Sequence, residues 1–152
     1  MRQILLITLC LLAFIPATIA QSMWQPSAEP TSIPSGAKRF IYADEAQYFE
    51  LDTSVWTAVS ARIPMEVNRL DARQGFQVSI PMPNGDIETF LFAESPIMEA
   101  SLAAQYPEIS TYVAHCPNHP EWYGKFDFTP QGFHGMILGV EGGSVFIDPV
   151  FH

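Results

Sequence analysis

A β-hairpin encoded in the middle of the chain constrains its fold most. Two runs rich in β-branched and aromatic residues, 77–80 and 87–93, flank the turn sequence PNGD at 83–86. Asparagine, glycine and aspartate readily adopt the backbone angles of tight turns, and such a turn between two strand-like runs is typical of an antiparallel hairpin. Ser95 before Pro96 then ends the second strand, because proline restricts the backbone of the residue that precedes it. The sequence therefore predicts a fold that contains antiparallel β-sheet.

Helix and strand patterns surround this hairpin. Asp52 or Thr53 is placed to cap a short helix that Pro64 ends. The apolar residues that share one face of this helix are Val55, Trp56, Val59 and Ile63. A second short helix is predicted at 99–106, a loop at 116–123, and further strands at 40–51, 109–114, 125–129, 133–139 and 144–148. Together these elements predict an α+β fold, mainly antiparallel β-sheet built from hairpins, with two short helices.

Three parts of the chain differ in composition. Residues 1–20 combine Arg2, an apolar run and an ending of small residues, which is the pattern of a secretory signal peptide. Residues 21–38 contain three prolines among small and polar residues, so we expect a flexible leader. Residues 39–152 then form one β-rich domain. We expect the chain to be secreted, periplasmic or extracellular, and to have no contact with the membrane after cleavage.

Acidic residues outnumber basic residues. The 16 aspartates and glutamates against 7 lysines and arginines give a net charge of −9. This charge repels nucleic acids and anionic membrane surfaces, so the sequence argues against both as partners. Of the 2 cysteines, Cys10 falls in the predicted signal peptide, which leaves Cys116 without a partner for an internal disulfide. We therefore expect packing, or binding to another protein, to stabilise the fold.

The sequence lacks the residue patterns of common catalytic sites. It contains no Gly-x-Ser-x-Gly turn, no glycine-rich phosphate loop and no His-Glu-x-x-His helix. We therefore predict no catalytic residues, no cofactor and no enzymatic activity.

One cluster of potential metal ligands remains. His115, Cys116 and His119 lie within five residues, and imidazole and thiolate groups bind zinc, with Glu121 as a conceivable fourth ligand. The spacing differs from that of a zinc finger and Pro117 stiffens the segment, so an ordinary surface loop is the favoured interpretation. A small metal-binding protein that uses these three residues is the alternative.

Aromatic residues are frequent in the predicted strands. We expect these rings to form the core, because alternate residues of a strand face the same side of a sheet. They are Phe90, Phe92, Trp122, Tyr123, Phe126, Phe128, Phe133 and Phe146. If they were exposed, they would favour an extracellular adhesion or binding domain instead. Two carboxylate pairs that resemble a glycosidase site, Glu88 with Glu94 and Asp127 with Asp148, are expected to be solvated strand residues.

The segment from Ile80 to Pro149 resembles a known family. The motifs that carry the resemblance are IPMPNG at 80–85, ESPIM at 94–98, LAAQYPEI at 102–109, KFDFTPQGFH at 125–134 and IDP at 147–149. In this order and spacing they resemble the amino-terminal pro-region of secreted bacterial reprolysin-like zinc metallopeptidases, which belong to the metzincins.

The resemblance implies a domain that acts by binding. In the family, the pro-region chaperones or shields a metallopeptidase catalytic domain that follows it, whereas this chain stops at His152. No residue here matches the zinc ligands or the general base of that catalytic domain. We therefore expect a secreted, non-catalytic domain that binds a separate metallopeptidase domain, or a truncated remnant of such a precursor.

Overall fold

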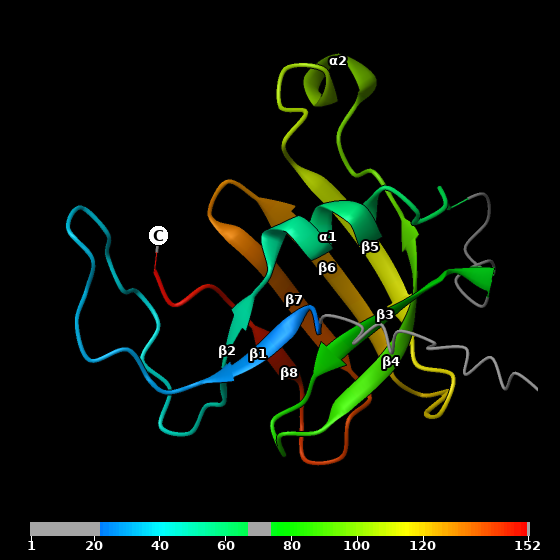
Figure 1. The fold of residues 1–152 in the computed structure, drawn as a ribbon. Helices are drawn as coiled ribbons and strands as arrows, with labels where there is room; N and C mark the ends of the chain where they lie inside the picture. The colour runs from blue at the N-terminus through cyan, green and yellow to red at the C-terminus, as the bar shows by residue number, and fades with distance from the viewer. Residues whose placement is uncertain (1–21, 67–73, 152) are drawn as a thin grey trace, which may run out of the picture.

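A six-stranded antiparallel sheet forms the body of the protein (Figure 1). The computed structural model describes residues 22–66 and 74–151, so the predicted signal peptide at 1–20 lies outside the described residues. Each strand pairs with the next one along the chain, as in a meander. The strands are β3 (Phe76–Pro81), β4 (Ile87–Glu94), β5 (Ser110–His115), β6 (Tyr123–Thr129), β7 (Gly132–Leu138) and β8 (Val145–Ile147). With two short helices beside this sheet, the predicted α+β class is confirmed.

The predicted hairpin is formed by β3 and β4. Their register runs from Phe76 opposite Phe92 to Pro81 opposite Ile87. At the turn, Gly85 has a φ of 88°, an angle that favours glycine, and the Asp86 N–H donates to the Asn84 side-chain oxygen at 3.1 Å. The turn residues therefore adopt the tight turn that their chemistry predicts.

Helix α1 (Thr53–Ser60) begins and packs as the sequence predicts. The Asp52 carboxylate caps it, because its Oδ1 accepts the backbone N–H groups of Ser54 at 3.0 Å and Val55 at 3.1 Å. Trp56 points into the core and is only 2% exposed. None of the helices among residues 22–66 and 74–151 is long and apolar enough to cross a membrane.

Replacing Asp52 with alanine is expected to lower the free energy of unfolding by about 1 kcal/mol, because two N–H groups at the start of α1 lose their acceptor. Urea denaturation followed by circular dichroism measures this loss. Asp52→Asn keeps a capping oxygen and should restore most of the stability, whereas Asp44→Ala, in an exposed loop, should change it by less than about 0.5 kcal/mol. Equal losses in all three variants would contradict the capping role.

Helix α2 (Ala100–Ala103) is shorter than the helix predicted at 99–106. No residue of α2 is buried, so tertiary packing does not support a longer helix. The Tyr106 N–H bonds to the Ala103 carbonyl in a tighter turn, and Pro107 follows. The predicted helix is therefore confirmed only as a single turn.

The expected flexible leader contains a strand, which corrects the prediction for residues 21–38. Strand β1 (Trp24–Ser27) pairs antiparallel with β2 (Tyr48–Leu51), which is the ordered end of the strand predicted at 40–51. Trp24 is buried, and its indole N–H donates to the Ser79 carbonyl at 2.8 Å. Pro26 is tolerated because β1 is an edge strand. The prolines of this segment favour a leader, whereas the adjacent apolar residues Met23 and Trp24 are both buried and anchor it to the core.

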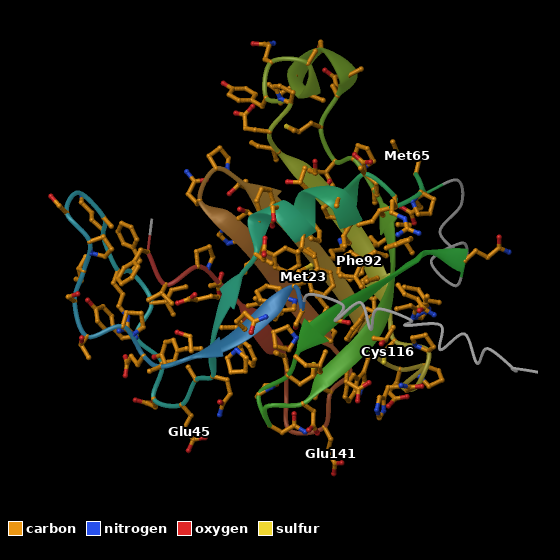
Figure 2. All side chains as sticks on the ribbon, in the orientation of Figure 1. Met23, Glu45, Met65, Phe92, Cys116 and Glu141 are labelled. Carbon is orange, nitrogen blue, oxygen red and sulfur yellow. The ribbon has the colours of Figure 1, made fainter. Side chains whose placement is uncertain are left out.

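Aromatic rings fill the core between the sheet, α1 and the β1–β2 hairpin. The Phe126 ring lies 4.6 Å from the ring of Phe92 and 5.7 Å from that of Phe133, and Trp56 contacts Phe133 at 5.0 Å between ring centroids. Figure 2 shows Phe92 within the body of the fold, while side chains such as Glu141 extend from peripheral loops.

The expected aromatic core is confirmed for most of the rings. Phe90, Phe92, Phe126 and Phe133 are buried in one cluster, and Trp122 and Phe128 pack against it. Tyr123 is half-buried. For Phe146 the prediction is wrong, since its side chain is 65% exposed on the opposite face of β8. The rings of Phe90, Phe92 and Phe126 are therefore not available as an exposed platform for a ligand.

Candidate functional site

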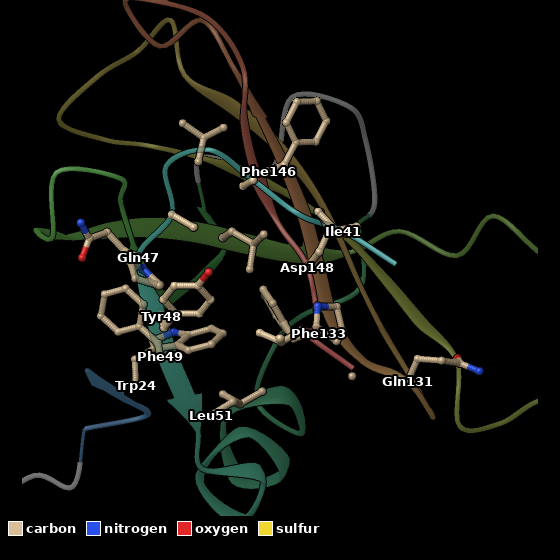
Figure 3. Close-up of a pocket in the computed structure, with 18 of the residues that line it drawn as sticks. Trp24, Ile41, Gln47, Tyr48, Phe49, Leu51, Gln131, Phe133, Phe146 and Asp148 are labelled. Carbon is tan, nitrogen blue, oxygen red and sulfur yellow. The ribbon is translucent and has the colours of Figure 1, made fainter. Parts of the chain in front are cut away.

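A pocket of about 830 Å³ lies between the β1–β2 hairpin and strand β8. It is lined by Trp24, by residues between 39 and 53, and by the segments 81–83, 128–133 and 144–150. Figure 3 shows Tyr48 and Phe49 of β2 on one side of the pocket and Phe146 and Asp148 on the other. We name this site the β2–β8 pocket.

Two strands that each have an unpaired edge among the described residues line the β2–β8 pocket. Strand β8 pairs with β7 on one side, and β2 pairs with β1 on one side. Across residues 22–66 and 74–151, no further strand covers the second edge of either one. The backbone N–H and C=O groups on such edges are available for pairing with another chain.

The inner surface of the pocket is aromatic and firmly packed. Trp24 and Phe133 meet edge to face at 5.4 Å between ring centroids, and both are buried in the core. Phe49 and Leu51 of β2 pack against the same cluster. A surface of this kind favours apolar ligand groups.

The outer wall of the pocket is the chain between β1 and β2, which Arg39 holds in place. Its guanidinium forms an ion pair with Glu29 at 2.8 Å and donates to the Tyr48 hydroxyl at 3.1 Å and to the Ile41 carbonyl at 3.1 Å. The guanidinium also lies 4.9 Å from the Tyr42 ring centroid. Arg39 therefore links both ends of this segment to β2.

The contact between Arg39 and Glu29 changes the ionisation of both side chains. The hydrogen bond from Arg39 lowers the pKa of the Glu29 carboxyl below its ordinary value of 4.5, and the same hydrogen bond raises the pKa of the Arg39 guanidinium. Since the carboxyl pKa is lower in the folded chain, the ion pair favours the folded state above the ordinary pKa of Glu29. This contribution disappears as the pH falls through the lowered value.

The carboxyl carbon of Glu29, followed by NMR across a pH titration, is expected to change at a midpoint below 4.5. In Arg39→Met the midpoint should rise toward the ordinary range of glutamate, because the main hydrogen-bond donor is gone while that of Tyr48 remains. Lys38→Met removes the neighbouring positive charge and serves as the control. A midpoint that does not move in Arg39→Met would show that the ion pair does not form in solution.

Three charged side chains line the pocket within the described part of the chain: Arg39, Glu45 and Asp148. Arg39 is already paired with Glu29. Glu45 is exposed, and Asp148 lies 3.5 Å from His134 Nδ1. The rim therefore carries two carboxylates next to an apolar interior, and the whole chain has a net charge of −9.

The structure does not bring the three candidate metal ligands together. Cys116 is buried, whereas the His119 ring stacks on Trp122 at 3.8 Å and its Nδ1 lies 3.7 Å from Glu121. His115 Nδ1 lies 3.5 Å from the Trp122 carbonyl. The described residues contain no group of three or more histidine, cysteine, aspartate or glutamate side chains that could hold a metal ion.

The fold also separates one of the two carboxylate pairs. Glu88 and Glu94 lie six residues apart on the same strand, which places them about 20 Å apart at 3.3 Å per residue. This distance exceeds what either glycosidase mechanism uses. On the neighbouring strands, Asp127 lies opposite His134, which is also close to Asp148.

Comparison with protein-family models, with curated proteins and with solved structures found no match for this chain. The resemblance to reprolysin-like pro-regions therefore stays a prediction.

Sequence reasoning did not find the β2–β8 pocket. Its lining residues come from five separate stretches of the chain, and none of them forms a catalytic or metal-binding motif. One signal was present: the run Phe40, Ile41 and Tyr42 is apolar yet precedes an acidic pair, and all three side chains are exposed in the structure. An exposed apolar run of this kind indicates an interaction surface.

Proposed function

We propose that this chain is a secreted binding domain whose β2–β8 pocket receives part of another polypeptide. The observation that supports the proposal is the position of a large, apolar pocket between two uncovered strand edges. The pocket falls in the size range of ligand sites, and its interior offers aromatic contacts close to free backbone groups.

The partner that we propose is a reprolysin-like metallopeptidase domain. The motifs between Ile80 and Pro149 support this choice, because in the family they resemble, the pro-region binds such a domain. Three of these motifs meet at the pocket: the stretches 81–83, 128–133 and 147–149 all contribute to its lining. The partner would be held or shielded by contact, without a reaction on this chain.

Mixing the protein, purified after secretion, with a reprolysin-like metallopeptidase domain tests the proposal. We expect a complex on size-exclusion chromatography, and inhibition of cleavage of a fluorogenic peptide at micromolar concentrations. Phe146→Lys places a positive charge at the pocket and should weaken inhibition at least tenfold. Ile97→Lys alters an apolar side chain that is 81% exposed outside the pocket lining, and should leave inhibition unchanged. Absence of both complex and inhibition would contradict the proposal.

A further inference from the structure

The backbone of β8 is the part of the β2–β8 pocket that discriminates most between ligands. Its register with β7 pairs Val145 with Ile137 and Ile147 with Gly135, and this pairing uses one edge of the strand. Residues 144–150, which include all of β8, line the pocket, and the second edge of β8 pairs with no strand among the described residues. A row of alternating N–H and C=O groups is matched by the backbone of an extended polypeptide, whereas a compact small molecule satisfies few of them.

The side chains on the two faces of β8 favour a ligand strand in which apolar and polar residues alternate. Val145 and Ile147 face the core, while Phe146 faces the opposite side and is exposed. A strand added beside β8 would therefore direct every second side chain toward Trp24 and Phe133, which are apolar. The intervening side chains would lie on the same face as Phe146 and Asp148.

The charges at the rim favour a basic ligand. Glu45 and Asp148 line the pocket, and the positive charge of Arg39 is compensated by Glu29. A second copy of this chain would bring a further net charge of −9 to the same surface, which opposes self-association. Lysine or arginine side chains on the ligand would instead be attracted.

From these three observations we infer that the β2–β8 pocket binds an extended segment with alternating apolar and basic residues, which adds to β8 as a strand. This inference rests on the proposed function and specifies which part of a partner enters the pocket. The segment belongs to another protein and presents its backbone to the free edge of β8. Its apolar residues face Trp24 and Phe133, and its basic residues lie near Asp148.

The probe is the fluorescein-labelled peptide Lys-Val-Thr-Val-Lys-Val-Thr with both ends blocked, titrated with the secreted protein and followed by anisotropy. We expect saturable binding that weakens as salt is raised. The same peptide with glutamate in place of lysine should bind at least tenfold more weakly. Two further analogues of the peptide carry N-methyl groups, one on the valines and the other on the remaining residues, so that each analogue blocks one edge of the peptide strand. At least one analogue should lose tenfold in affinity, and unchanged binding of both would overturn strand addition.

Two pairs of protein variants test the place of binding. Glu45→Lys with Asp148→Lys reverses both rim charges and should weaken binding of the lysine peptide at least tenfold, while it strengthens binding of the glutamate peptide. Glu99→Lys with Glu108→Lys changes the net charge equally at exposed positions outside the pocket lining, and should have less than a threefold effect. If Asp148→Lys disturbs the fold, Glu45→Lys alone replaces the double variant in this test, because Glu45 lies in an exposed loop. Equal effects of the two pairs would overturn the assignment to this pocket.

The outcomes separate this inference from the proposed function. If the metallopeptidase domain binds but the lysine peptide neither binds nor competes with it, the inference is wrong and the proposed function stands. If the peptide binds as expected but the metallopeptidase domain does not, the pocket has the inferred specificity and the proposed partner is wrong. Sedimentation that shows self-association through the same residues would identify a second copy as the occupant and overturn the inference.

Discussion

Replacing Phe126 with alanine is expected to lower the free energy of unfolding by about 3–5 kcal/mol, the range for removing a fully buried phenylalanine. The Phe126 side chain is 2% exposed and contacts three other rings, those of Phe90, Phe92 and Phe133. It also lies directly against Gly124 and Gly135 on the neighbouring stretches of sheet. The backbone of two paired strands therefore prevents the cavity from closing, which places the loss toward the upper end of the range.

Phe146→Ala is the matched control for this prediction, because the same atoms are removed from a side chain that is 65% exposed. Its effect on stability should stay within about 0.5 kcal/mol. Urea denaturation of the two variants and the unchanged protein, followed by near-ultraviolet circular dichroism, measures both differences. A loss of less than 1 kcal/mol in Phe126→Ala would show that the aromatic cluster does not form as described.

Replacing Gly139 with alanine is expected to be similarly damaging, for a different reason. Gly139 has a φ of 85°, where a side chain costs about 1–2 kcal/mol. In addition, a Cβ at this position would meet the backbone carbonyl of Glu121, with its carbon only 2.9 Å away. The loop after β5 would have to move, and overpacking of this kind costs about 1–3 kcal/mol. The combined loss is therefore about 2–5 kcal/mol.

Gly142→Ala separates the two contributions to the Gly139 effect. Gly142 has a φ of 93°, and a Cβ there would meet nothing within 4 Å. Its replacement should therefore show only the cost of the backbone angle, about 1–2 kcal/mol. Thermal unfolding of both variants measures the difference. Equal losses at the two positions would show that the approach of the Glu121 carbonyl does not contribute.

The elements that could be predicted from the sequence depend on local chemistry. The hairpin around Gly85, the cap at Asp52 and the meander of strands after Ser110 each follow from residues that lie next to one another in the chain. The strand formed by Trp24 could not be found in this way, because it depends on pairing with Leu51 and neighbouring residues far along the chain. Its prolines, read locally, indicated a leader instead.

The position of Phe146 illustrates a second limit. Alternation along a strand predicts that every other residue faces the same way, but it does not say which face of the sheet is covered. The β1–β2 hairpin and α1 cover the face of Val145 and Ile147, which leaves Phe146 outside. The β2–β8 pocket results from the same arrangement, since β1 and β2 cover the sheet without pairing with β8. Residue patterns alone contain no information about that placement.

The burial of Cys116 has a practical consequence. Its side chain is 1% exposed, and it is the free cysteine of the described residues. A thiol-reactive dye therefore reaches this sulfur only when the segment after β5 opens, so the labelling rate reports how often the native protein exposes this region. Because the chain carries this reporter naturally, the frequency of opening can be followed in every variant, and in the presence of a bound partner, without introducing a label elsewhere.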